Sequence, residues 1–230
     1  MKYNLFLIYT VMVFWSGWLN AQPIISEQLF SEQLIRLPAR PSGASADYEG
    51  SPFLVDSFQQ GQVVLTSNAK FNLPMRFNIY NELIEVKFKG RDMQLQPNDL
   101  ISRIELNGHT ILSTEYELED KKKKGFLFLL DSGVVSLLQK RNISFKEWRP
   151  AKAQEAAPTP AAFKPSLDQF FIRYANGRVV SLPSVKDLAS AFPSHRNVVS
   201  DFIKKEKIKL KKDKLLQLFT YYRSLEPAKS

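Results

Sequence analysis

The sequence contains no cysteine and only two histidines, His109 and His195. Without cysteine the chain can form no disulfide framework, no thiol nucleophile and no thiolate metal site. A zinc site usually takes three or four nitrogen or sulfur ligands, and two histidines without an H-x-x-x-H spacing do not supply them. We therefore expect no metal site and no cofactor. Stability has to come from a hydrophobic core, for which the chain is long enough.

Catalytic and phosphate-binding motifs are also missing. The serine-containing loops before residue 52 do not match G-x-S-x-G, and no glycine-rich phosphate loop or calcium loop occurs. We single out no catalytic residue and favour a non-enzymatic protein. The alternative is a hydrolase with a carboxylate-only site in the β-rich body, since carboxylate pairs can meet in space alone. The acids at strand spacing are Glu82, Glu85, Glu115, Glu117 and Glu119.

Only one stretch of the sequence is long and apolar, and it begins the chain. Lys2 provides a charged start, residues 5–15 are apolar except for Thr10, and Ala21 is a small residue at the expected cleavage point. This pattern is typical of a secretory signal peptide. A membrane span needs roughly 20 apolar residues, which this run does not reach. We expect residues 1–21 to be removed, the chain to be exported (periplasm, outer membrane or outside), and no transmembrane segment to remain.

The net charge of +9 is unevenly distributed. Residues 22–150 hold 16 basic and 16 acidic side chains, whereas residues 151–230 hold 15 basic and 7 acidic ones, which leaves +8. Clustered like charges attract counter-ions and speed association with charged partners. A solvated helix face is the alternative, because Ile208 and Leu210 have the pattern of buried anchors between the lysines. The candidate contacts for an anionic partner are Lys204, Lys205, Lys207, Lys209, Lys211, Lys212 and Lys214.

The partner that this charge predicts is an envelope protein or an anionic envelope surface, such as lipopolysaccharide, outer-leaflet phosphates or an acidic polysaccharide. Nucleic acid is not expected, because the lysines lack the interleaved exposed aromatic residues on which single-stranded bases stack. The sequence leaves the oligomeric state open.

Alternation of apolar and polar residues predicts a β domain over residues 51–149. The pattern is clearest in residues 75–80 and 83–88, and short strands follow one another with turns between them, which is typical of an antiparallel sandwich or open barrel. Residues 22–50 form an N-terminal extension. Residues 150–165 carry four prolines among alanines, which is typical of a stiff linker; an ordered strap is the alternative, because Phe163 needs cover.

Residues 166–230 are expected to form a basic unit of a β-hairpin and two or three helices. Asn176-Gly177 lies between two apolar runs, which is a strong hairpin signal. Helices are expected near residues 184–192, 194–205 and 212–225, the last with a broad apolar stripe. The predicted fold class is therefore α+β, with an antiparallel β-rich body followed by this smaller unit.

Two groups of residues carry a resemblance to a known class of proteins. The first comprises residues 50–54 with Phe58, Gly61, Val63 and residues 75–80, and the second comprises residues 201–204 and 218–222. With these residues the chain resembles a group of uncharacterised exported proteins of Gram-negative bacteria, over residues 48–225. Such proteins often combine a strand-rich N-terminal half with a C-terminal end like this one. The resemblance supports export and a two-part architecture, and it implies no activity, cofactor or catalytic residue.

Overall fold

The computed structural model describes residues 34–36, 48–151 and 157–226. The predicted signal peptide, most of the N-terminal extension and residues 152–156 lie outside the described residues. The strands are β1 (Ile35–Arg36), β2 (Tyr48–Glu49), β3 (Gln59–Leu65), β4 (Lys70–Asn78), β5 (Leu83–Phe88), β6 (Arg91–Leu95), β7 (Ile101–Leu106), β8 (His109–Leu118), β9 (Lys121–Asp131), β10 (Ser136–Lys140), β11 (Ile143–Lys146), β12 (Ala161–Pro165), β13 (Gln169–Arg173) and β14 (Val179–Ser181). The helices are the 3-10 helix η1 (Leu188–Ala191), α2 (Arg196–Lys205) and α3 (Lys212–Leu225). The prediction of an α+β fold with a β-rich body is confirmed.

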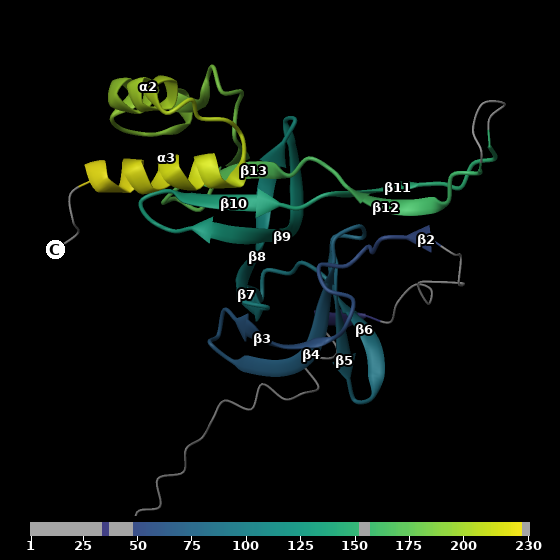
Figure 1. Cartoon of the computed structure of the whole chain (residues 1–230). Helices are drawn as coiled ribbons and strands as arrows, with labels where there is room; N and C mark the ends of the chain where they lie inside the picture. Colours follow the sequence, from purple (N-terminus) through teal and green to yellow (C-terminus); the bar gives the residue numbers. More distant parts are fainter. Residues whose placement is uncertain (1–33, 37–47, 152–156, 227–230) are drawn as a thin grey trace, which may run out of the picture.

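Most strands belong to one sheet that closes on itself at one end. Its order is β1-β6-β5-β4-β3-β7-β8-β14-β13-β10-β9, and β9 also pairs with β8. Strands β8, β14, β13, β10 and β9 therefore form a closed five-stranded ring, while β1 and β3 to β7 extend from it as a curved meander. Figure 1 shows the meander in the lower part of the molecule and the ring above it, covered by α2 and α3.

Strand β8 joins the two parts because its two edges are used differently. Along one edge it pairs with β9 over its whole length, from Thr110 to Leu118. The opposite edge is shared: Ile111 pairs with Ile104 of β7, and Glu117 pairs in parallel with Val180 of β14. One strand thus satisfies backbone donors and acceptors from both parts of the fold, as buried strands must.

Alternating side chains bury both faces of the ring strands. In β13, Phe170 and Ile172 pack beneath the helices, whereas Phe171 points into the ring. In β10, Leu137 and Leu138 divide in the same way. The ring interior is small and filled by side chains, as expected for a barrel of few strands. It contains Leu112, Tyr116, Leu127, Leu138, Phe171 and Val179.

Gly125 leaves space for the side chain of Tyr116, which lies inside the five-stranded ring. The ring of Tyr116 packs edge-on against Phe171 with centroids 5.0 Å apart. A Cβ atom on Gly125 would lie 2.9 Å from Cε1 of Tyr116, which is closer than real Cβ contacts come. A glycine at this position of β9 is therefore required by packing and not by backbone conformation.

A half-buried ion pair stabilises the meander. Arg76 contacts the carboxylate of the buried Glu85 through Nε at 2.8 Å and Nη2 at 2.7 Å. The guanidinium lies over the ring of Phe53 at 3.7 Å and near that of Phe58 at 4.7 Å. Its Nη1 donates to the backbone carbonyl of Asp56. These contacts hold residues 51–58 against β4 and β5, and stacking of this kind is particular to arginine.

The predicted linker contributes a strand instead of a plain spacer. Ala161–Pro165 forms β12, which pairs with β11 and in parallel with β2, and Figure 1 shows β11 and β12 projecting from the body as an arm. Phe163 is covered by Tyr48, Tyr80 and Phe145, with ring centroids 4.7 to 5.2 Å from its own. This arrangement follows the alternative of an ordered strap, because an apolar ring gains by leaving water.

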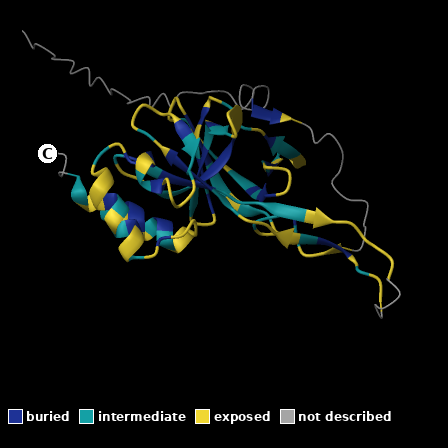
Figure 2. Cartoon of the chain, turned by 90° about the horizontal axis from the view of Figure 1, so that it is seen from above, coloured by how far each residue is buried: buried dark blue, intermediate teal, exposed yellow. Residues whose placement is uncertain are grey.

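Elements from both sides of residues 150–165 share one core. Strand β10 pairs with β13 across this segment, and Val135 and Leu137 pack with residues of η1, α2 and α3. The helix expected at 212–225 is α3 itself, α2 begins at Arg196, and the expected helix at 184–192 is shortened to η1. Figure 2 shows buried residues on one side of α2 and α3 and exposed residues on the other.

Gly125→Ala should lower the free energy of unfolding by about 1–3 kcal/mol, the usual cost of overpacking a core. The added methyl group would meet the Tyr116 ring, which Phe171 holds in place. Gly133→Ala is the matched control, because its Cβ would meet no atom closer than 3.5 Å. Urea unfolding of both variants tests this, and an equal effect of the two substitutions would contradict the packing argument.

Candidate functional site

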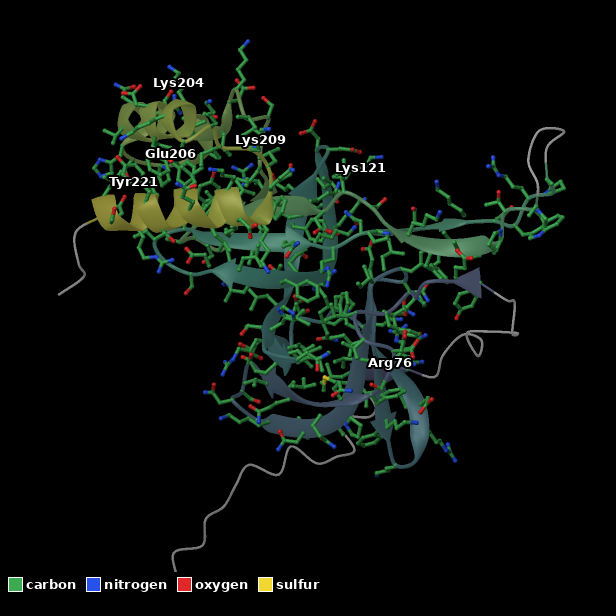
Figure 3. All side chains as sticks on the ribbon, in the orientation of Figure 1. Arg76, Lys121, Lys204, Glu206, Lys209 and Tyr221 are labelled. Atoms are coloured by element: carbon green, nitrogen blue, oxygen red, sulfur yellow. The ribbon has the colours of Figure 1, made fainter. Side chains whose placement is uncertain are left out.

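The seven candidate lysines gather where α2 ends and α3 begins. Lys204 and Lys205 form the last turn of α2, Lys207 and Lys209 lie on the connection, and the remaining three begin α3. We call these seven residues the lysine corner. Figure 3 shows Lys204 on α2, Lys209 near the start of α3 and Glu206 between the two helices.

The connection after α2 has a fixed conformation. Lys207 adopts a left-handed backbone with φ of 50°. Its N–H donates to the carbonyl of Lys204 at 3.3 Å, and the N–H of Ile208 donates to the carbonyl of Ile203 at 3.0 Å. This is the hydrogen-bond pattern of a Schellman motif, in which an apolar contact closes the helix end. Ile208 and Ile203 make that contact inside the core.

The next turn exposes Leu210. The N–H of Lys211 donates to the carbonyl of Lys209 at 2.7 Å, so Leu210 lies at the centre of a three-residue γ-turn. Leu210 is 39% exposed, whereas Ile208 is 3% exposed. The expectation that both residues are buried anchors is therefore correct for Ile208 and wrong for Leu210. The γ-turn directs the chain away from the core after Ile208 has entered it.

Most of the lysine side chains have no partner within the described part of the chain. Lys214 is half-buried and donates to the carbonyl of Glu206 at 3.1 Å and to Oε1 of Gln217 at 3.2 Å. The other six lysines are exposed, and none makes a side-chain hydrogen bond or ion pair with a described residue. Only Glu206 and Asp213 oppose their charge in residues 204–214.

The helix dipoles have opposite effects on the lysines at the end of α2 and on those at the start of α3. Lys204 and Lys205 lie at the negative end of α2, where cations are favourable. Lys211 and Lys212 lie at the positive end of α3, where cations are unfavourable by about 0.3–1 kcal/mol each. No side chain caps this helix start. The lysines that begin α3 are therefore not placed there for the stability of the helix.

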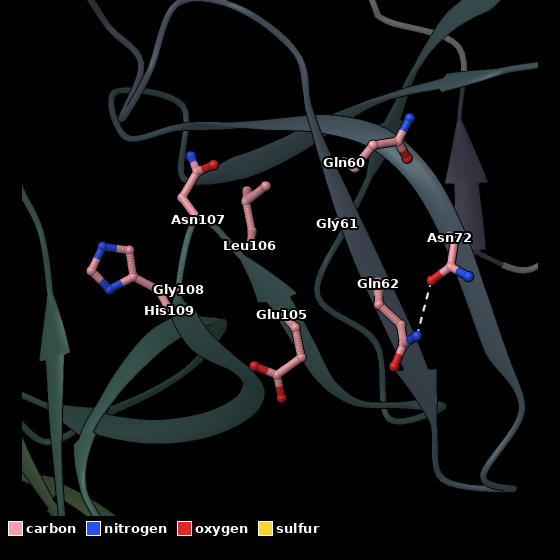
Figure 4. A pocket seen from close by; sticks show the side chains of 9 residues that line it. All are labelled: Gln60, Gly61, Gln62, Asn72, Glu105, Leu106, Asn107, Gly108 and His109. Carbon is pink, nitrogen blue, oxygen red and sulfur yellow. Dashed lines mark hydrogen bonds between the residues drawn. The ribbon is translucent and has the colours of Figure 1, made fainter.

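A pocket lies in the meander, on the β3, β4 and β7–β8 side. It has a volume of about 410 Å³ and is lined by Gln60, Gly61, Gln62, Asn72, Glu105, Leu106, Asn107, Gly108 and His109 (Figure 4). Gln62 donates to Asn72 at 2.9 Å. Burial lowers the pKa of His109, and the positive charges of Lys212 and Arg141 lower it further. The imidazole is thus kept neutral near neutral pH and packs edge-on against Phe128.

Three of the five acids named for the alternative hydrolase are engaged with cations. Glu85 is paired with Arg76, and Glu82 is paired with Lys140 at 2.7 Å. Glu117 accepts from Arg178 at 2.8 and 3.3 Å, and this hydrogen bonding lowers the pKa of Glu117. The catalytic acid of a glycosidase needs a raised pKa, whereas the pKa of Glu117 is lowered.

His195 joins a small cluster with Ser194, Tyr222 and Glu226. The Ser194 hydroxyl donates to the Glu226 carboxylate and lies 2.6 Å from the Tyr222 hydroxyl. The His195 imidazole approaches the same carboxylate at 4.0 Å. A serine nucleophile needs the imidazole as its proton acceptor, whereas here both groups face the acid. The cluster fastens the end of α3 to the segment before α2.

Among the described residues, no group of three histidine, aspartate or glutamate side chains could hold a metal ion. No helix in the described ranges has the length and apolar character needed to cross a bilayer. No protein-family model, curated protein or solved structure matches this chain.

Lys207→Gly should raise the free energy of unfolding by about 1 kcal/mol, because glycine adopts the left-handed conformation without the Cβ clash. Lys209→Gly removes the same charge at a position without positive φ and should leave stability unchanged or lower it. Chemical denaturation of both variants at one salt concentration separates backbone strain from charge. Equal shifts in the two variants would contradict the assignment of strain to Lys207.

Glu226 should make stability depend on pH in the acid range. Hydrogen bonds from Ser194 and Tyr222 lower the pKa of Glu226 below its ordinary value of 4.5. The resulting stabilisation is complete above pH 4.5 and is lost as the pH falls through the folded-state pKa. Thermal unfolding should show Glu226→Gln less stable than the parent at pH 7, with the gap closing towards pH 3. Ser194→Ala should reduce this pH dependence, and a gap that stays constant with pH would contradict the assignment.

Proposed function

We propose that the protein is an exported, non-enzymatic binding module whose lysine corner contacts a polyanion of the cell envelope. The observation that carries the proposal is the placement of exposed, unpaired lysines at the positive end of α3. Positive charge there opposes the helix dipole. A position that reduces stability is expected where residues serve binding.

The surrounding structure supports binding over a purely solubilising role. Solubility is served by lysines anywhere on the surface, whereas these lysines are held together by a closed helix end. Ile208 anchors the connection in the core, and Lys207, directly before it, adopts a strained left-handed backbone. The fixed backbone of the connection presents the lysines together, so the backbone itself loses little conformational freedom on binding.

Export supports the choice of polyanion. The charged start, the apolar run and Ala21 make up a signal peptide pattern. In the envelope, the abundant polyanions are phosphate-bearing and acidic-polysaccharide surfaces. A lysine array recognises such partners as point charges without needing a defined ligand shape.

Binding to soluble linear polyphosphate tests the proposal. Calorimetric titration of the exported chain at low salt should detect binding that weakens as salt is raised, because exposed charges are screened over about 10 Å at 0.1 M salt. Replacing Lys207, Lys209 and Lys211 together by glutamine should weaken binding about tenfold, at roughly 0.5 kcal/mol for each exposed charge.

The matched control is the triple replacement of Lys121, Lys122 and Lys123 by glutamine. These lysines are also exposed and lie on β9, and replacing them removes the same amount of charge. Their replacement should change the affinity much less, because Glu117 and Glu115 stand in the facing strand. Equal losses in the two triple variants would show that net charge alone matters. Absence of binding by the parent chain would refute the proposal.

A further inference from the structure

We infer that the polyanion is the surface of an anionic lipid bilayer and that Leu210 enters this surface between the lysines. The inference rests on the proposed function, since it specifies what the lysine corner contacts. The inference goes beyond the proposed function because it assigns a role to Leu210, an uncharged residue. The structural basis is the combination of a fixed, exposed leucine with cations on both sides of it.

The position of Leu210 is determined by the residues before and after it. Ile208 is held in the core two residues earlier, and the γ-turn from Lys209 to Lys211 makes Leu210 the outermost point of the turn. Leu210 as a whole residue remains 39% exposed. Its immediate neighbours in sequence are Lys209 and Lys211, both exposed. The apolar group and the charges are therefore presented together.

A single exposed leucine is ordinary on a protein surface, and it is the surrounding lysines that distinguish Leu210. A soluble polyanion offers phosphate or carboxylate groups in water and gives no advantage to an apolar side chain. A bilayer offers both an anionic headgroup layer and an apolar region beneath it. Long lysine side chains can stay at the phosphates while a neighbouring apolar group lies deeper.

The charge complementarity favours an anionic membrane over a neutral one. Each lysine close to an anionic leaflet contributes about fivefold in affinity, and the corner presents six exposed lysines without partners among the described residues. Leu210 alone would give weak insertion, and the lysines alone would hold the protein at the surface. Both are needed for binding that combines salt dependence with an apolar contribution.

Sedimentation with vesicles tests this inference. The exported chain should bind vesicles of phosphatidylcholine and phosphatidylglycerol, and should bind vesicles of phosphatidylcholine alone much more weakly. Leu210→Ser should weaken binding to the mixed vesicles about five- to tenfold, as expected for removing a partly buried leucine side chain from the apolar layer. Its affinity for soluble polyphosphate should stay within twofold of the parent.

Val198→Ser is the matched control. Val198 is 43% exposed and lies near the start of α2, at the other end of this helix from the lysine corner. This variant should bind the mixed vesicles as the parent does. In addition, Leu210→Trp should show a blue shift of its added fluorescence with mixed vesicles and none with polyphosphate.

The outcomes separate this inference from the proposed function. Parent-like vesicle binding by Leu210→Ser, with polyphosphate binding intact, overturns the lipid inference and leaves the proposed function standing. If Leu210→Ser binds neither the vesicles nor polyphosphate, the lipid inference is also overturned, because the substitution has then disturbed the structure of the turn. If the parent chain is a dimer and Leu210→Ser is a monomer, the lipid inference is overturned, because Leu210 then belongs to a contact between two copies. Failure of the parent chain to bind either ligand refutes the proposed function itself.

Discussion

The fold depends on strand β8 having enough length to pair with two partners on one edge. Its first residues pair with β7 and its last residues pair with β14, while β9 pairs along the opposite edge. Both parts of the molecule are thereby built on one β8–β9 hairpin. Alternating residues of β9 then enter different cores: Phe126 and Phe128 the meander, and Leu127 the ring.

This arrangement determines where the lysine corner points. The outer faces of β10 and β13 are apolar and must be covered, and α2, α3 and η1 provide the cover. Because α2 and α3 both contribute to that core, their connection has to lie at its rim. Ile203 and Ile208 close the rim from inside. The residues that remain on the connection are exposed by necessity, and their chemistry is free to serve binding.

Features with a local cause could be predicted from the sequence, whereas those with a distant cause could not. The strands of the meander and the range of α3 follow from periodicity, and the lysines were found from charge alone. Strand β12 lies in a proline-rich stretch and forms because Tyr48 and Tyr80 cover Phe163. The closure of the ring depends on one parallel contact between Glu117 and Val180. The exposure of Leu210 could not be predicted, because an i, i+2 pattern with Ile208 does not reveal a γ-turn.

The charge pattern and the stability of the α2–α3 connection work against each other. Lys207 occupies a conformation that glycine would adopt more easily, and Lys211 and Lys212 repel the start of α3. A sequence under selection for stability alone would place glycine and an acidic residue at these positions. The fold tolerates the loss because the connection is anchored by Ile208 and by the Lys214 contacts to Glu206 and Gln217. The anchored core thus tolerates a strained, cationic surface, and the binding role that we propose accounts for both features.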